Sequence, residues 1–194
     1  MTYPEAPQYS PQPSLVPVGA ATPGDLRLPL YGATFGQAAS RFVKKYATFT
    51  GRSSRSEYWW VVLLNFLLSL IPTALAVIGI VIGASYAAAN PVSTVIGYDA
   101  ETGEPVTYES SSGIINYAPA AALIFIGLGL LVLIGLALII PTYALLWRRL
   151  HDANLPGPLA LLTLIPTVGG IATIIIALLP SRREGQRYDL PPAV

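Results

Sequence analysis

The chain of 194 residues is 53% hydrophobic and only 11% charged, and its mean hydropathy of +0.58 is too high for an ordinary soluble domain. Cysteine is absent, which excludes disulfides, thiolate metal sites and cysteine nucleophiles. The net charge of +1 and the single histidine argue against a nucleic-acid partner and against a metal centre, so no cofactor is predicted.

Residues 1–33 are predicted to form a disordered, proline-rich tail. Seven prolines fall within the first 30 residues, and there is almost no aliphatic pattern. A segment with so little apolar surface cannot offset the entropy lost on folding.

Residues 34–49 are predicted to form a short amphipathic helix. Apolar side chains recur at spacings of three and four residues, with basic side chains mostly between them. Such a helix lies on an anionic membrane surface or docks on the protein's own helix ends. The apolar positions are Phe35, Ala38, Ala39, Phe42, Val43 and Tyr46.

A charged and aromatic cluster over residues 51–60 leads directly into the first apolar run. Arg52 and Arg55 precede Trp59 and Trp60. Cations beside indole rings are typical of a membrane–water boundary.

Residues 58–83 are predicted to form the first membrane span, because the run exceeds the roughly 20 apolar residues that cross a bilayer. Pro72 is expected to kink this helix. Asn65 is expected to form a hydrogen bond to another helix.

Residues 84–117 form the long polar connection, with four acids and no Lys or Arg. The segments 95–98 and 105–108 flank a Thr-Gly turn and indicate a small β-hairpin. We therefore predict an acidic loop on the external side of the membrane.

Two more apolar segments follow, at residues 118–147 and 158–179. The first is long enough to be a second span. The second is interrupted around Pro166 and Gly169, so it is either a third span or a re-entrant hairpin. Residues 189–194 form a short tail. The predicted fold is thus an all-α integral membrane protein with three apolar helical segments.

Orientation follows from the basic residues near the span ends. Five lie between Arg41 and Arg55, the acidic loop has none, and Arg148 and Arg149 follow the second span. This predicts a cytoplasmic N-terminus. The side of the C-terminal tail depends on whether the third segment spans or returns.

Two charged motifs give the chain a resemblance to a known family. They read Phe49-Thr-Gly51-Arg52-x-x-Arg55-x-Glu57-Tyr58-Trp59 and Arg149-Leu150-His151-Asp152. The chain resembles, from about Gln37 to Tyr188, the bacterial inner-membrane family of unknown function DUF805. That resemblance implies a small multi-span inner-membrane protein. The family's usual ending, Gly-x-Asn-Arg-Tyr-Gly, here reads Gly185-Gln-Arg-Tyr-Asp189.

The topology brings the two motifs to the same membrane face, where their charged residues are expected to converge. We expect Glu57 to pair with Arg148 or Arg149, and Asp152 to pair with Arg52 or Arg55. The candidate residues are Arg52, Arg55, Glu57, Arg148, Arg149, His151 and Asp152.

The leading functional hypothesis is a structural or interaction protein with an ion-paired cluster at its cytoplasmic face. The alternatives are an anionic-headgroup site built from the arginines and a small oligomeric transporter or channel. An enzyme is not predicted, because a His-Asp pair alone lacks a nucleophile or a metal set. The expected partners are the lipid bilayer, its anionic headgroups, and a second copy or another membrane protein.

Overall fold

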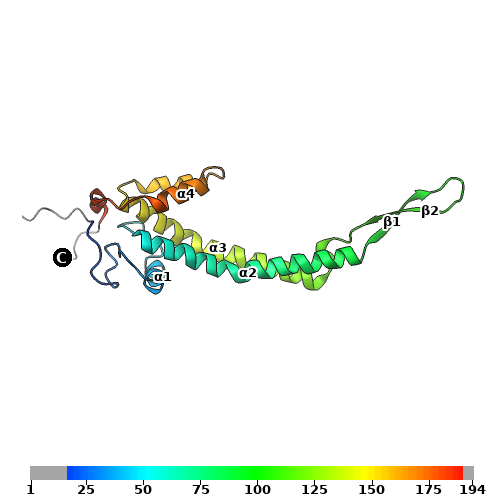
Figure 1. Ribbon diagram of the computed structural model, residues 1–194, viewed down its shortest axis with the longest axis horizontal. Helices are drawn as coiled ribbons and strands as arrows, with labels where there is room; N and C mark the ends of the chain where they lie inside the picture. The colour runs from blue at the N-terminus through cyan, green and yellow to red at the C-terminus, as the bar shows by residue number, and fades with distance from the viewer. Residues whose placement is uncertain (1–16, 190–194) are drawn as a thin grey trace, which may run out of the picture. The chain divides into compact units, whose positions relative to one another are not determined.

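The computed structural model describes residues 17–189, and its helices and strands follow one another as in Figure 1. The described residues divide into two compact units, residues 17–61 with 140–189, and residues 62–139. The elements are α1 (Phe35–Lys44), α2 (Arg55–Ala89), β1 (Val92–Tyr98), β2 (Pro105–Ser110), the 3-10 helix η1 (Ile114–Asn116), α3 (Ala118–Asp152), η2 (Gly157–Leu164), α4 (Gly169–Leu178) and η3 (Arg183–Tyr188).

In the first unit, residues 17–33 are ordered, which corrects the prediction of disorder for this part of the tail. The segment has no helix or strand, yet Leu30 and Ala33 are buried together with Ala38 of α1. Its carbonyl groups also accept hydrogen bonds from buried arginines, as described below. The remainder of the predicted tail, residues 1–16, lies outside the described residues.

The amphipathic helix is present as α1 but is shorter than predicted. Thr34 and Gln37 form a capping box at its start, which satisfies two backbone amides that the first turn leaves free. Lys45 caps its C-terminus, and residues 46–49 are not helical. Arg41, placed by the sequence pattern among the polar positions, is buried.

In the second unit, α2 and α3 pack closely through glycine. A Cβ atom at Gly127 of α3 would lie 2.6 Å from the carbonyl oxygen of Pro72 and 2.7 Å from the backbone nitrogen of Ala76. Small residues let two helices in a membrane approach until their backbones touch. Pro72 lies inside α2 and does not end it.

Both long helices exceed their predicted bounds, since α2 begins three residues earlier and α3 continues to Asp152. The second charged motif is therefore the last turn of α3 and not part of a following loop.

Asn65 does not form the predicted hydrogen bond. Its buried Oδ1 has no hydrogen-bond partner among residues 17–189.

The close approach at Gly127 predicts a difference between two neighbouring glycines of α3. Gly127→Ala should lower stability by about 1–3 kcal/mol, because the added methyl group meets backbone atoms that cannot move aside. A methyl group at Gly129 would have no other atom within 4 Å, so Gly129→Ala should be neutral or slightly stabilising. Thermal unfolding midpoints of both variants in detergent would test this. Equal midpoints would contradict the packing.

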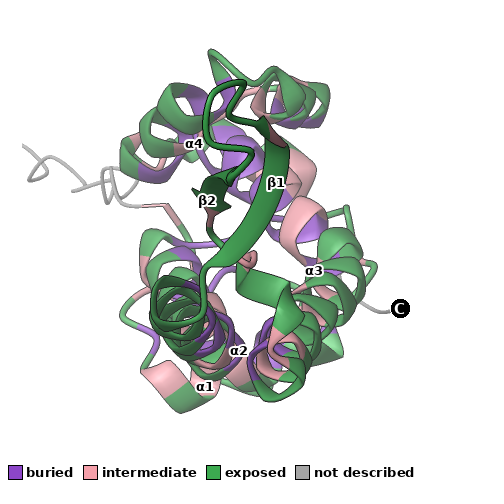
Figure 2. Ribbon diagram, turned by 90° about the vertical axis from the view of Figure 1, so that its right-hand side faces the viewer, coloured by how far each residue is buried: buried purple, intermediate pink, exposed green. Residues whose placement is uncertain are grey.

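The polar connection contains a β-hairpin, so the predicted all-α class is incomplete. β1 and β2 are antiparallel, with an irregularity between Val95 and Gly97. At the turn, the Asp99 carboxylate accepts hydrogen bonds from the amides of Glu101 and Thr102. Almost all of both strands is exposed, as the green ribbon in Figure 2 shows.

The third apolar segment is divided into two short helices, η2 and α4, that lie side by side (Figure 1). Gly169 allows the chain to reverse here, because a Cβ atom at this position would collide with the backbone of Thr163. The chain then returns to the end of α3, where the Arg182 amide donates a 2.8 Å hydrogen bond to the Asp152 carbonyl. At about 2.0 Å per residue for the 3-10 helix η2 and about 1.5 Å per residue for α4, neither helix is long enough to cross a bilayer.

Candidate functional site

Asp152, at the C-terminus of α3, is the centre of a charged cluster in the first unit. Its side chain is 0% exposed and accepts four hydrogen bonds. Arg149 Nη1 lies 2.9 Å from Oδ2, one turn earlier on the same helix, and Arg52 Nη1 lies 3.4 Å from Oδ1. The hydroxyl groups of Tyr31 and Ser181 donate at 2.8 and 2.5 Å. A carboxylate can be buried only when it is satisfied in this way.

Arg52 connects the two charged motifs to the C-terminal tail. Its guanidinium forms a bidentate pair with Asp189, with both nitrogen–oxygen distances at 2.7 Å. It also donates to the carbonyl of Val18. Burial works against the charged form, but the pairs with Asp189 and Asp152 hold the pKa of Arg52 above its ordinary value. Four separate segments of the chain therefore meet at one side chain.

Glu57 forms a second buried pair, but with a partner that differs from the prediction. Its Oε1 lies 2.5 Å from Arg41 Nε, whereas the expected pairing with Arg148 or Arg149 is wrong. Its Oε2 accepts from the Ser54 amide at 2.8 Å and from the Leu30 amide at 3.3 Å. Glu57 thus also caps the first turn of α2, where an acid complements the helix dipole.

Arg41 is held by the proline-rich segment as well as by Glu57. Its guanidinium donates to the carbonyl groups of Pro23, Asp25 and Leu28 at 3.0, 2.7 and 2.5 Å. Proline-rich stretches have few free amides and leave carbonyl oxygens available. The segment therefore provides acceptors for a buried cation without forming regular secondary structure.

Two cations near the Arg41–Glu57 pair are buried, and each has an N–H donor without a hydrogen-bond partner among the described residues. Lys45 is 3% exposed, and its Nζ has no hydrogen-bond partner among the described residues. Arg148 donates through Nε to the carbonyl of Ala144, but its Nη2 has no partner within residues 17–189. Burial and the neighbouring Arg148 guanidinium lower the pKa of Lys45 to about 7. The carboxylate of Glu57 offsets part of this positive charge.

His151 is buried and is held by contacts with two other segments of the chain. Its Nδ1 lies 2.9 Å from the carbonyl oxygen of Gly51, which requires a proton on Nδ1. Its ring stacks on Tyr188 at 4.0 Å and 3°. Gly185 lets the tail pass close enough for this stacking, because a Cβ there would lie 2.5 Å from the His151 carbonyl oxygen.

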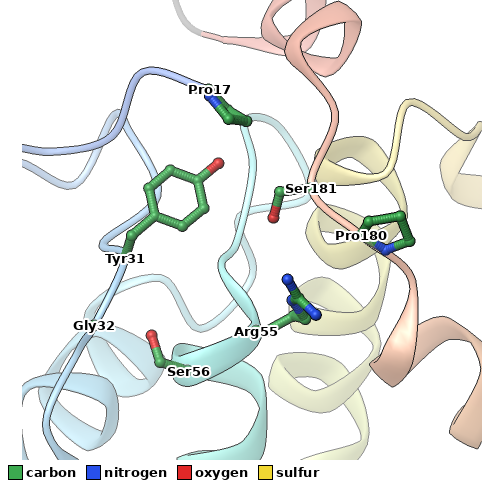
Figure 3. A pocket seen from close by; sticks show the side chains of 7 residues that line it. All are labelled: Pro17, Tyr31, Gly32, Arg55, Ser56, Pro180 and Ser181. Carbon is green, nitrogen blue, oxygen red and sulfur yellow. The ribbon is translucent and has the colours of Figure 1, made fainter. Parts of the chain in front are cut away.

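Arg55 is the one candidate that stays outside these contacts. Its side chain is exposed and forms no ion pair or hydrogen bond with another described residue. It lines a cavity of about 440 Å³ together with Tyr31 and Ser181, whose side chains come from two other segments (Figure 3). The alternative pairing of Arg55 with Asp152 is therefore absent, and Arg52 takes that position.

Four residues of the cluster were not predicted from the sequence: Tyr31, Arg41, Ser181 and Asp189. Of these, Asp189 left a signal, because an acid stands where the family pattern has glycine. No group of three or more His, Asp or Glu side chains in the described part of the chain is placed to hold a metal ion.

The two long helices define the class of protein. Both are long and apolar enough to cross a membrane, yet only 17% of the most apolar stretch of α2 and 11% of that of α3 is buried. A soluble protein would cover such a surface. The buried charged residues lie in the first unit, which contains the start of α2 and the end of α3. The chain is therefore an α-helical membrane protein.

Residues 46–190 match the family described as protein of unknown function DUF805, and the chain belongs to this family. It is 24% identical over 150 residues to the inner membrane protein YhaI of Escherichia coli K12, which covers 77% of this chain and 90% of the relative. The YhaI protein of Escherichia coli O157:H7 matches with the same values. No solved structure matches the chain.

Proposed function

We propose that this chain is a multi-span inner-membrane protein with a structural or interaction role, in which the charged cluster acts as a clasp at the cytoplasmic face. The observation that carries this proposal is the complete burial of Arg52 and Asp152 in a network closed by Asp189 and Tyr31. The pairs of Arg52 with Asp152 and with Asp189 join segments that are distant in sequence. The clasp holds the N-terminal segment, the start of α2, the end of α3 and the tail together.

A structural role is favoured over a catalytic one by the state of the reactive groups. The carboxylate oxygens of Asp152 accept hydrogen bonds from four donors. His151 stacks on Tyr188 and is hydrogen-bonded to the carbonyl of Gly51. A general base must reach a substrate proton. Asp152 and His151, the two candidate general bases of this cluster, are already bound to neighbouring groups.

The proposed topology has the clasp inside the cell and the β-hairpin outside. All eleven Lys and Arg residues belong to the first unit, and the β-hairpin connection carries four acids and no base. This asymmetry supports a cytoplasmic first unit. The hydrogen bond from Arg182 to Asp152 supports a re-entrant third segment with its tail on the same face.

Single cysteines would test the topology, because the native chain has none. In spheroplasts of a bacterial host, a membrane-impermeant maleimide should label Thr102→Cys at the hairpin turn. It should label Lys44→Cys and Glu184→Cys only after lysis, which also serves as the control for their reactivity. Labelling of Lys44→Cys in intact spheroplasts would reverse the orientation. Labelling of Glu184→Cys in intact spheroplasts, without labelling of Lys44→Cys, would show a third full span.

A further inference from the structure

The cavity beside Arg55 combines a free guanidinium with a lining that has no acidic side chain. Its residues are Pro17, Tyr31, Gly32, Arg55, Ser56, Pro180 and Ser181. A volume of about 440 Å³ lies in the range of small-molecule sites. In Figure 3 the Arg55 side chain lies between the start of α2 and the Pro180–Ser181 segment.

The surrounding charges leave Arg55 available for an external anion. Asp152 and Glu57, the acids of the two motifs, are paired with Arg52, Arg149 and Arg41. The hydroxyl protons of Tyr31 and Ser181 are donated to Asp152. Arg55 therefore supplies the donors, and a guanidinium presents them in a fork that matches a phosphate.

The position of Arg55 in the chain adds to this preference. It is the first residue of α2, a 35-residue helix. Arg55 also marks the start of a helix able to span the membrane, where lipid headgroups lie.

A second, apolar cavity is lined by a residue that directly precedes the Pro180–Ser181 segment in the chain. Pro180 and Ser181 line the first cavity, and the preceding residue, Leu179, lines a second cavity of about 280 Å³. The second is lined only by Leu, Ile, Val and Ala side chains from the end of α3, η2, α4 and their connecting segments, with Leu162 and Ile175 among them. A free phosphate would use only the first cavity, whereas a phospholipid would use both.

We propose that the Arg55 cavity binds the phosphate of an anionic phospholipid, with one acyl chain in the apolar cavity beside it. This proposal rests on the proposed function, in which the clasp lies at the cytoplasmic face of the membrane. It adds a ligand at that face. The chemistry shared with any phosphate ion is the oxyanion on the Arg55 fork. The acyl chain is what assigns the site to a lipid.

Titrations of the full-length protein in neutral detergent would test the site, with the shift in thermal unfolding midpoint as the measure of binding. The probes are dioctanoyl phosphatidylglycerol, dioctanoyl phosphatidylcholine and inorganic phosphate. The phosphatidylglycerol should bind most tightly. Arg55→Ala should weaken its binding at least about tenfold. The matched control Arg183→Ala removes another exposed arginine with no ion pair among the described residues and should change binding less than about twofold.

Ile175→Trp would fill the apolar cavity at an exposed position. It should weaken phosphatidylglycerol binding and leave inorganic phosphate unaffected. Equal losses in Arg55→Ala and Arg183→Ala would show a general charge effect and overturn the site. Equal affinity for the lipid and for inorganic phosphate, or for phosphatidylglycerol and phosphatidylcholine, would also overturn it. Because the titration is independent of sidedness, its failure is distinct from a failure of the cysteine labelling.

Discussion

Asp152→Asn is expected to destabilise the first unit by about 3–5 kcal/mol, the cost of removing one partner from a buried ion pair. The substitution preserves the size of the side chain but leaves Arg149 without a carboxylate. Tyr31 donates to Oδ1 and Ser181 to Oδ2, and an asparagine amide keeps only one acceptor oxygen, so one of the two hydroxyl groups loses its acceptor. Arg52 keeps its bidentate pair with Asp189, so the cost is expected to arise mainly at Arg149.

Unfolding by sodium dodecyl sulfate in mixed micelles, together with the level of protein in the membrane, would measure this loss. Glu184→Gln is the matched control, because it removes an exposed acid from the same unit and should change stability by less than about 0.5 kcal/mol. Adding Arg149→Gln to Asp152→Asn should recover part of the loss. If Asp152→Asn matches Glu184→Gln, the clasp is not a stabilising element.

The two long helices and the β-hairpin could be read from the sequence because each has a strong local signal. Residues 58–83 and 118–147 carry no charge that would disfavour the hydrocarbon core, and both runs exceed the length that a bilayer requires. The hairpin followed from two strand-like segments around a Thr-Gly turn. The limits of these elements shifted because the charged motifs continue the helices, and apolar patterns do not mark those ends.

Of the contacts inside the clasp, one could be predicted from the sequence and another could not. The pair between Asp152 and Arg52 was predicted, because topology alone brings the two motifs to one face. Arg41 was missed as the partner of Glu57, since it lies at a polar position of an amphipathic helix. Its burial depends on three backbone carbonyl groups of the proline-rich segment, and a carbonyl group has no sequence signature.

The proline-rich segment shows the physical reason for the error at residues 17–33. Composition measures how much apolar surface a segment can bury, and this segment buries little. It is ordered instead by donors that lie elsewhere in the chain, on Arg41 and Arg52. Hydrogen bonds to charged groups are stronger than neutral ones, so a few of them hold a segment that its own composition would leave free.

Glu57→Gln should also cost about 3–5 kcal/mol, because it leaves Arg41, Lys45 and Arg148 buried around a neutral side chain. Double-mutant cycles would identify the partner. Arg41→Gln and Glu57→Gln should couple by about 1–3 kcal/mol, since the two side chains are in direct contact. Arg149→Gln and Glu57→Gln should be additive within about 0.5 kcal/mol, because Arg149 pairs with Asp152. The opposite pattern, coupling through Arg149 and additivity through Arg41, would restore the pairing expected from the motifs alone and contradict the structure at its second ion pair.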